Sequence, residues 1–127
     1  MIPDEAFERG LALRCKMFGR AEAQRQIDTA TAFTRPLQEW VTRACFGELW
    51  QRPDLDLRIR SMLTVAVLAA LGRPNQIKLH VKGALANGVT PEEIREVLLH
   101  VMAYAGLPAA ADGFAAAAEA LTDTGRA

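Results

Sequence analysis

Residues 58–88, RIRSMLTVAVLAALGRPNQIKLHVKGALANG, predict two consecutive helices and decide the fold class. Asp56 is a suitable N-cap for the first helix, and Gly72 suits the left-handed position that ends it. Pro74 fits the first turn of the second helix, because its fixed φ is helical and its missing N–H is not needed there. We therefore expect two helices joined by a short turn at the centre of the chain.

The second of these helices carries a polar pair. Gln76 and His80 stand four residues apart and therefore share one face of the helix, among apolar neighbours. Because imidazole titrates near neutral pH, His80 is a candidate general acid or base. The alternative is a buried histidine that bonds a backbone carbonyl, and spacing alone leaves both interpretations open.

Composition favours helices throughout. Half of the 127 residues are hydrophobic but only 6% are aromatic, and Ala and Leu dominate over the β-branched residues typical of strands. Lys plus Arg equals Asp plus Glu at 15 each, so no net charge attracts nucleic acid. The length fits one domain, so we expect a single all-α domain over residues 1–127 that does not bind nucleic acid.

Spacing and end signals predict further helices outside the central pair. We expect them at residues 3–18, 21–32, 36–49, 91–104 and 108–121, with a frayed tail at 122–127, which makes a bundle of six to seven helices. Thr34 is a candidate cap for the third helix, and Thr90, Pro91 and Glu93 form a capping box. The Ala-rich last helix is expected to pack closely against another helix, of this subunit or a neighbouring one.

Apolar spacing also predicts which side chains are buried in the first half of the chain. In the first helix these are Phe7, Leu11, Cys15 and Phe18; in the third they are Leu37, Trp40, Val41, Ala44 and Cys45.

Several common sites lack support in the sequence. Cys15 and Cys45 lie thirty residues apart without a CxxC pair, so we interpret them as small buried residues in a reducing compartment. His100 follows Glu96 by four residues, which favours a surface ion pair over the edge of a metal site. No metal is expected.

Arginines cluster before the central helices, at positions 52, 58 and 60. A guanidinium fork is well shaped to hold a substrate carboxylate, although for Arg58 alone a solvated helix start is the favoured interpretation.

The ends and the apolar runs bear on location. The acidic start MIPDEAFERG does not look like a secretory signal, and the longest apolar run, residues 62–72, is too short to span a bilayer. We expect a soluble cytoplasmic protein without a membrane partner.

The order of several short motifs resembles the carboxymuconolactone decarboxylase family. The motifs are WxRPxLxxRxRS at 50–61, LH at 79–80, AxxNGVT at 84–90, EIxEV at 93–97 and YxGxPAA at 104–110. They occur without gaps in order, and the similarity extends from about residue 5 to residue 120. The short, single-domain branch from protocatechuate breakdown is the most similar.

This resemblance implies a fold and an assembly. It predicts an alkylhydroperoxidase-D-like helical subunit, a homo-oligomer (trimer or ring-like hexamer), and no metal or organic cofactor. Peroxidase relatives use a CxxC before the histidine, but Arg73 and Gln76 occupy those positions here, so thiol chemistry is not expected. Decarboxylase-like members usually have glutamate where this chain has Gln76, and glutamine cannot accept a proton.

The reaction implied by the resemblance belongs to the β-ketoadipate pathway of aromatic compound degradation. A cofactor-free carboxy-lyase would convert 4-carboxymuconolactone, or a close lactone acid, to 3-oxoadipate enol-lactone. His80 would donate a proton, Gln76 would orient it or bind the lactone oxygen, and Arg60 would bind a carboxylate. Four further residues complete the expected substrate-binding set: Arg52, Trp50, Ser61 and Tyr104.

Two alternatives stay open. Gln76 favours a relative that runs another proton transfer or decarboxylation on a different small acid. The other alternative is a non-catalytic helical oligomer.

Overall fold

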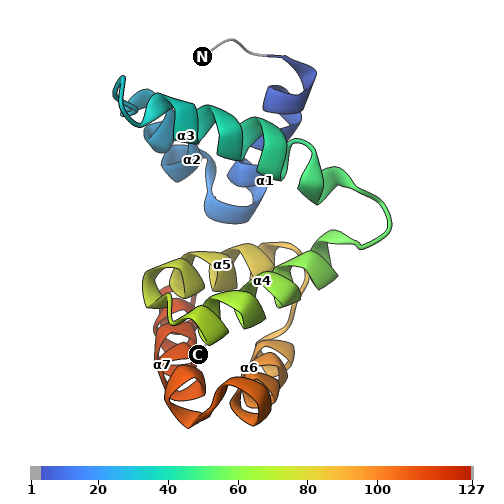
Figure 1. Cartoon of the computed structure of the whole chain (residues 1–127), viewed down its shortest axis with the longest axis vertical. Helices are drawn as coiled ribbons and strands as arrows, with labels where there is room; N and C mark the ends of the chain where they lie inside the picture. Colours follow the sequence, from blue (N-terminus) through green and yellow to red (C-terminus); the bar gives the residue numbers. More distant parts are fainter. Residues whose placement is uncertain (1–3, 127) are drawn as a thin grey trace. The chain divides into compact units, whose positions relative to one another are not determined.

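The computed structural model describes residues 4–126 (Figure 1). Within this range the chain forms seven α-helices, a π-helical segment and a short 3-10 segment, and it contains no strand. The expected all-α fold is therefore confirmed. No helix of the described range is both long and apolar enough to cross a membrane.

The chain divides into two compact units, Met1–Leu57 and Arg58–Ala127, and the prediction of one domain over residues 1–127 stays a prediction. The first unit contains α1 (Glu5–Phe18), α2 (Arg20–Asp28), α3 (Arg35–Trp40), the π-helix η1 (Val41–Phe46) and the 3-10 segment η2 (Leu49–Gln51). The second contains α4 (Leu57–Leu71), α5 (Pro74–Ala86), α6 (Pro91–Ala105) and α7 (Leu107–Asp123).

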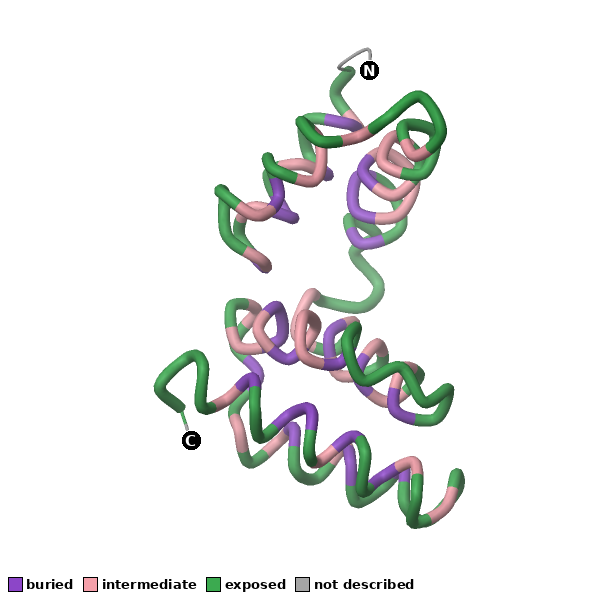
Figure 2. Tube along the Cα trace, turned by 90° about the vertical axis from the view of Figure 1, so that its left-hand side faces the viewer, coloured by how far each residue is buried: buried purple, intermediate pink, exposed green. Residues whose placement is uncertain are grey.

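The second unit is built around one apolar core to which all four of its helices contribute. Buried residues follow the inner sides of these helices, and exposed residues follow the outer sides (Figure 2). The core consists of Val65, Ala69, Ile77, Val81, Ala84, Val89, Ile94, Leu98, Val101, Ala116, Ala117 and Ala120. Small residues let α7 approach α5 and α6 closely, so the Ala-rich helix packs within its own chain.

The ends of the central helices follow the sequence signals. Gly72 has φ +70°, and the Arg73 N–H donates to the Leu68 carbonyl at 3.0 Å, which closes α4 with a Schellman motif. Thr90 Oγ1 accepts from the Glu93 N–H, and the Glu93 carboxylate accepts from the Thr90 N–H, which confirms the capping box of α6. The predicted tail is too long, because α7 continues to Asp123.

In the first unit the predicted buried face of α1 is wrong in part. Phe7 is buried, but the other buried residues are Gly10, Leu13, Arg14 and Met17. Leu11, Cys15 and Phe18 are only half-buried. Asp4 caps this helix by accepting from the Phe7 N–H at 2.8 Å. The predicted start at residue 3 lies outside the described residues.

The buried face of α1 differs from the predicted face because of Gly10. A Cβ placed on Gly10 would lie 1.7 Å from the Thr42 carbonyl oxygen and 2.9 Å from the Gly47 nitrogen. The backbone of α1 therefore touches the backbone of η1, and only a residue without a side chain permits this approach. Apolar spacing does not register a contact made by two main chains.

The middle of the first unit also departs from expectation. Helix α2 ends at Asp28, short of residue 32, and the Thr29 Oγ1 donates to the Arg25 carbonyl there. Thr34 does not cap α3, since its Oγ1 accepts instead from the Thr31 N–H at 2.9 Å. The single helix expected at 36–49 is divided into α3, η1 and η2.

The predicted core of that region is also partly wrong. In this chain the Leu37 side chain is 60% exposed and the Trp40 side chain is 70% exposed. The core of the first unit uses Leu13, Met17, Phe46 and Trp50 instead.

Candidate functional site

His80 lies in the middle of α5 and is half-buried. Burial lowers its pKa to about 4, because an imidazolium loses solvation inside the protein. The side chain is therefore neutral near pH 7. A neutral imidazole in such a place can take up a proton once an anion binds beside it, since a nearby negative charge favours the charged form.

Gln76 lies on α5 and Arg60 on α4, the two helices joined by the short turn after Gly72. Gln76 is one turn before His80 on α5; it is exposed, and its side chain makes no hydrogen bond with any described residue. Arg60 is half-buried in the first turn of α4. Helices α4 and α5 run in opposite directions around a short turn, so the start of α4 lies beside the end of α5 (Figure 1).

A hydrogen bond joins these two helix ends. The Asn87 Nδ2 donates to the Ser61 Oγ at 3.0 Å, and Ser61 is fully buried. Asn87 directly follows α5, two turns after His80, which is about 10 Å along the helix axis. Ser61 therefore faces Asn87 in this structure and has no exposed surface.

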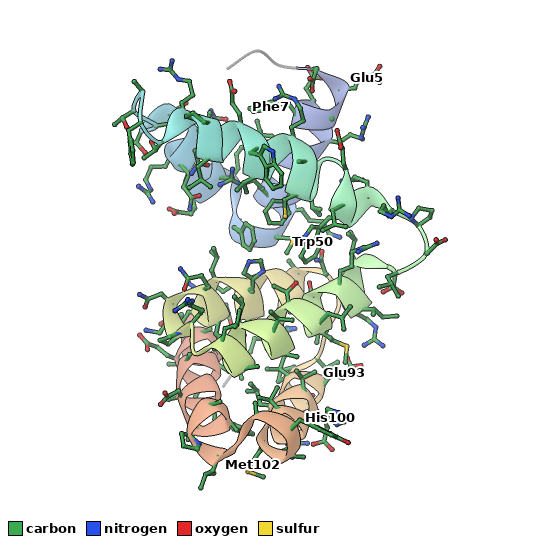
Figure 3. All side chains as sticks on the ribbon, in the orientation of Figure 1. Glu5, Phe7, Trp50, Glu93, His100 and Met102 are labelled. Carbon is green, nitrogen blue, oxygen red and sulfur yellow. The ribbon has the colours of Figure 1, made fainter. Side chains whose placement is uncertain are left out.

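A second contact lies at the same corner. The Arg58 guanidinium pairs with the carboxylate of Glu93 in the first turn of α6, and it holds the pKa of that carboxyl below its ordinary value. Glu93 is labelled in Figure 3. Arg58 thus stays partly exposed at the start of α4, and its side chain also joins α4 to α6.

Two of the predicted substrate-binding residues belong to the first unit. Trp50 is buried and packs against Phe46, with ring centroids 5.4 Å apart. Arg52 is exposed, and both residues line a hollow of about 300 Å³ formed by residues 50–57. The structure brings these two side chains together within their own unit.

Tyr104 lies on α6 and is 83% exposed. Its ring lies 5.0 Å from the ring of His100, which is labelled in Figure 3. The two rings line an apolar hollow of about 450 Å³ that does not include His80. The predicted ion pair between Glu96 and His100 is wrong, since His100 turns toward Tyr104 and no ion pair of Glu96 occurs within residues 4–126.

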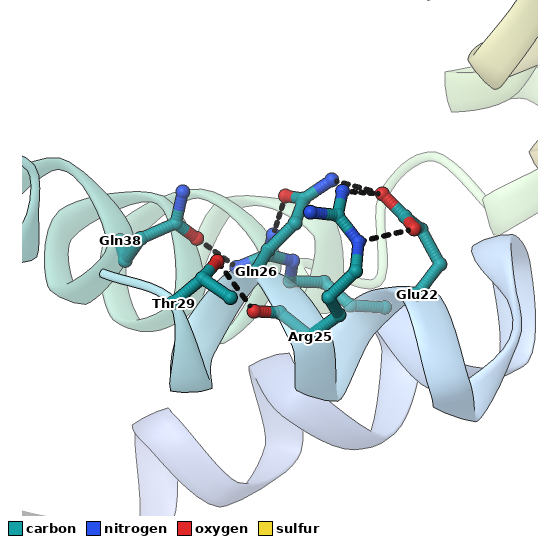
Figure 4. Close-up of polar contacts among 6 residues, drawn as sticks. Glu22, Arg25, Gln26, Thr29 and Gln38 are labelled. Carbon is teal, nitrogen blue, oxygen red and sulfur yellow. Dashed lines mark hydrogen bonds and ion pairs between the residues drawn. The ribbon is translucent and has the colours of Figure 1, made fainter.

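Sequence reasoning missed a buried polar cluster around Arg14 in the first unit. The Arg14 guanidinium is only 4% exposed. It donates to Gln26 at 2.5 Å, to Gln38 at 3.0 Å and to Thr42 at 2.9 Å. Gln26 in turn donates to Glu22, as Figure 4 shows. Burial lowers the pKa of Arg14 from its ordinary value. The sequence signal that could have revealed the cluster is Arg14 itself, a charged residue next to apolar positions of the first helix.

The cysteines and the possible metal ligands remain to be placed. Cys15 and Cys45 are free and half-buried, and burial raises the pKa of the Cys45 thiol. Within residues 4–126 no three His, Cys, Asp or Glu side chains gather in a way that could hold a metal ion.

The low pKa of His80 predicts a dependence of stability on pH. The unfolded chain binds a proton on His80 below about pH 6.5 but the folded chain only below about pH 4, so stability falls as the pH falls between these values. Above pH 6.5 the effect vanishes. Between pH 7 and pH 4.5 the wild type should lose roughly 2 kcal/mol more unfolding free energy than His80→Asn. Urea titrations at a series of pH values measure this, and parallel curves for the two proteins would contradict it.

Comparison with known proteins shows which proteins this chain is similar to. A model of the carboxymuconolactone decarboxylase family matches residues 35–119, which include α4, α5 and α6. The chain is 35% identical over 125 residues to a 4-carboxymuconolactone decarboxylase of Acinetobacter baylyi, covering 98% of this chain and 93% of the relative. It is 36% identical over 117 residues to a nitrosuccinic acid decarboxylase of Metarhizium robertsii, covering 92% and 82%.

A third relative matches a shorter part of the chain and has no named activity. It is an uncharacterized 15.0 kDa protein of Paracoccus denitrificans, 37% identical over 67 residues, which cover 50% of this chain and 49% of the relative. Both relatives with a named activity are decarboxylases, and the expected family resemblance is confirmed. Because the family model and two nearly full-length relatives agree, the chain belongs to the carboxymuconolactone decarboxylase family.

Proposed function

We propose that this protein is a decarboxylase that needs no cofactor and converts 4-carboxymuconolactone, or a close lactone acid, to 3-oxoadipate enol-lactone. The observation that carries the proposal is His80, a half-buried imidazole on α5 that is neutral near pH 7, beside the helix that bears Arg60. The likeness to the Acinetobacter baylyi decarboxylase over 98% of the chain supports the lactone as substrate.

The reaction needs an electron sink, an anion site and a proton. The bond between the ring carbon and its carboxylate breaks, carbon dioxide leaves, and the electron pair moves through the ring double bond to the lactone carbonyl. The resulting furanolate-like anion takes a proton on the ring carbon next to the carbonyl. Stabilising charge on that oxygen lowers the barrier to bond cleavage, and a placed acid completes the product.

Three side chains divide this work. Arg60 binds the carboxylate that remains in the product, since a guanidinium offers two parallel donors to it. The bound negative charge favours the protonated form of His80, which then delivers its proton to the ring carbon. Gln76 is exposed at the surface of the site and donates from its amide to the lactone oxygen.

The remaining predicted residues have lesser roles. Arg52 is proposed as a carboxylate ligand in the hollow that it shares with Trp50 in the first unit, and Tyr104 as a wall of the hollow on α6 that it shares with His100. Ser61 is fully buried and is assigned a positioning role below. The proposal also includes a homo-oligomer, trimer or hexamer, in the cytoplasm, acting in aromatic compound degradation.

A second function is favoured by a specific comparison. The Metarhizium robertsii relative is named for nitrosuccinic acid, a small acid in which a nitro group takes the place of a carbonyl as electron sink. A site with one cation and one proton donor can serve either substrate, because both reactions leave negative charge on oxygen. Gln76, which replaces the usual glutamate, fits a site adjusted to a different small acid. A non-catalytic helical oligomer is the third possibility.

Turnover of freshly generated 4-carboxymuconolactone by the wild type tests the proposal. We expect carbon dioxide release together with enol-lactone formation, and weaker release from nitrosuccinic acid. Gln76→Glu should keep lactone turnover and raise the pKa of His80 by about one unit, because it places a negative charge one turn away. The pH dependence of turnover measures this pKa.

A matched control isolates the position of the new charge. Asn75→Asp adds the same charge one residue earlier, off the shared face, and should leave the pH profile unchanged. If the protein turns over nitrosuccinic acid but not the lactone, nitrosuccinic acid replaces the lactone as the proposed substrate. Carbon dioxide release from neither acid, with both variants inactive, would overturn the proposal and leave the family and fold.

A further inference from the structure

The start of α4 is attached to the rest of the second unit by two side-chain contacts. Asn87 at the end of α5 donates to Ser61 at 3.0 Å, and Arg58 pairs with Glu93 at the start of α6. Arg60 lies between the two attached residues of α4. The residue proposed to bind the substrate carboxylate is therefore flanked on both sides by side chains held from other helices.

The first turn of a helix needs such anchors. Its N–H groups lack intrahelical partners, so it moves more readily than the turns that follow. The Asn87 main chain is itself fixed, because its N–H donates to the carbonyls of Gly83 and Ala84 at 3.0 and 3.1 Å. The side chain thus reaches Ser61 from a rigid base at the end of the helix that carries His80.

The Asn87 amide has a feature that stability alone does not explain. Its Oδ1 is buried and accepts no hydrogen bond from the described residues. A buried acceptor left without a donor weakens the fold, so an apolar pair at positions 61 and 87 would be at least as stable. Either orientation of the amide joins the two side chains, because a hydroxyl both donates and accepts.

We propose that Asn87, acting through Ser61, is a positioning residue that sets the distance between Arg60 on α4 and His80 on α5. This inference rests on the proposed function for its catalytic meaning. Its structural part does not depend on the proposed function: without the Asn87–Ser61 bond, the first turn of α4 moves away from α5. The carboxylate site then loses its alignment with the proton donor.

The test uses Asn87→Ala, Ser61→Ala and the double variant of the full chain. Each should raise KM for the lactone about tenfold with a smaller change in kcat, because carboxylate binding is weakened in ground and transition states alike. The double variant should match the single ones, because both substitutions remove the same bond. Ile94→Val is the control: it removes one buried methyl group from the core on α6, takes no part in the Asn87–Ser61 bond, and should leave KM unchanged.

A second measurement does not depend on activity. Hydrogen exchange of the amides at residues 60–63 should become about tenfold faster in Asn87→Ala than in Ile94→Val, relative to the change in the α7 amides. Unchanged exchange there, or an unchanged KM in both single variants, would overturn the positioning role. If exchange is faster in Asn87→Ala but the wild type turns over neither acid, the proposed function is overturned and the attachment of α4 by Asn87 remains.

Discussion

Replacement of His80 by alanine is expected to lower kcat for decarboxylation by about 10²–10⁴-fold, the usual contribution of a placed general acid. In the proposed mechanism the bound carboxylate favours the protonated form of the imidazole, which then gives its proton to the ring carbon. Because the substitution leaves Arg60, the proposed carboxylate ligand, in place, KM should change much less than kcat.

The measurement is steady-state carbon dioxide release by the wild type and the variant. His100→Ala is a matched control, since it removes the other histidine of the chain from a different helix and should keep turnover within about twofold. Added imidazole should restore part of the activity of the His80 variant by filling the space that the side chain leaves. Full activity of His80→Ala would exclude the residue as the proton donor.

The largest expected loss of stability follows from Gly10→Ala. In an exposed helix this change stabilises by about 1 kcal/mol, because alanine is the better helix former. Here the new methyl group would meet the Thr42 carbonyl and the Gly47 nitrogen, which are backbone atoms that cannot rotate aside. Helix α1 must separate from η1, and we expect a loss on the order of 3–5 kcal/mol in unfolding free energy.

Gly113→Ala serves as the comparison for this experiment. Its methyl group would lie 2.8 Å from the Leu98 Cδ2, the end of a side chain that can change rotamer. We expect a loss of about 1 kcal/mol. Guanidinium titrations followed by far-UV circular dichroism measure both variants, because Gly10 and Gly113 both lie in helices and helices in both units contribute to the signal. Equal stabilities of the two variants would contradict the backbone contact at Gly10.

The sequence predicts well those features that depend on local chemistry. Gly72 and Thr90 end and begin helices through hydrogen bonds within a few residues of themselves, and such signals are readable along the chain. The second unit accordingly follows the expected helices closely, with α4 and α5 in place. His80 and Gln76 share a face of α5 because helical periodicity requires it.

The misses arise where distant segments meet. The buried face of α1 is set by the approach of Gly10 to Thr42, and η1 replaces part of a regular helix beside that contact. Likewise, the bond between Asn87 and Ser61 joins residues 26 positions apart, which no periodicity records. The motifs that carry the family resemblance include both residues, but they do not indicate that the two side chains are in contact.

The neutral surroundings of Arg14 limit how this protein can change in evolution. Its guanidinium is held by uncharged acceptors on α2, α3 and η1, and each acceptor was contributed by a separate segment of the chain. Loss of any one leaves a buried cationic donor unmatched, which destabilises more than replacement of the whole group by apolar residues. Substitutions at positions 14, 26, 38 and 42 should therefore occur together. A homologue that has lost the arginine no longer needs hydrogen-bond acceptors at the other three positions.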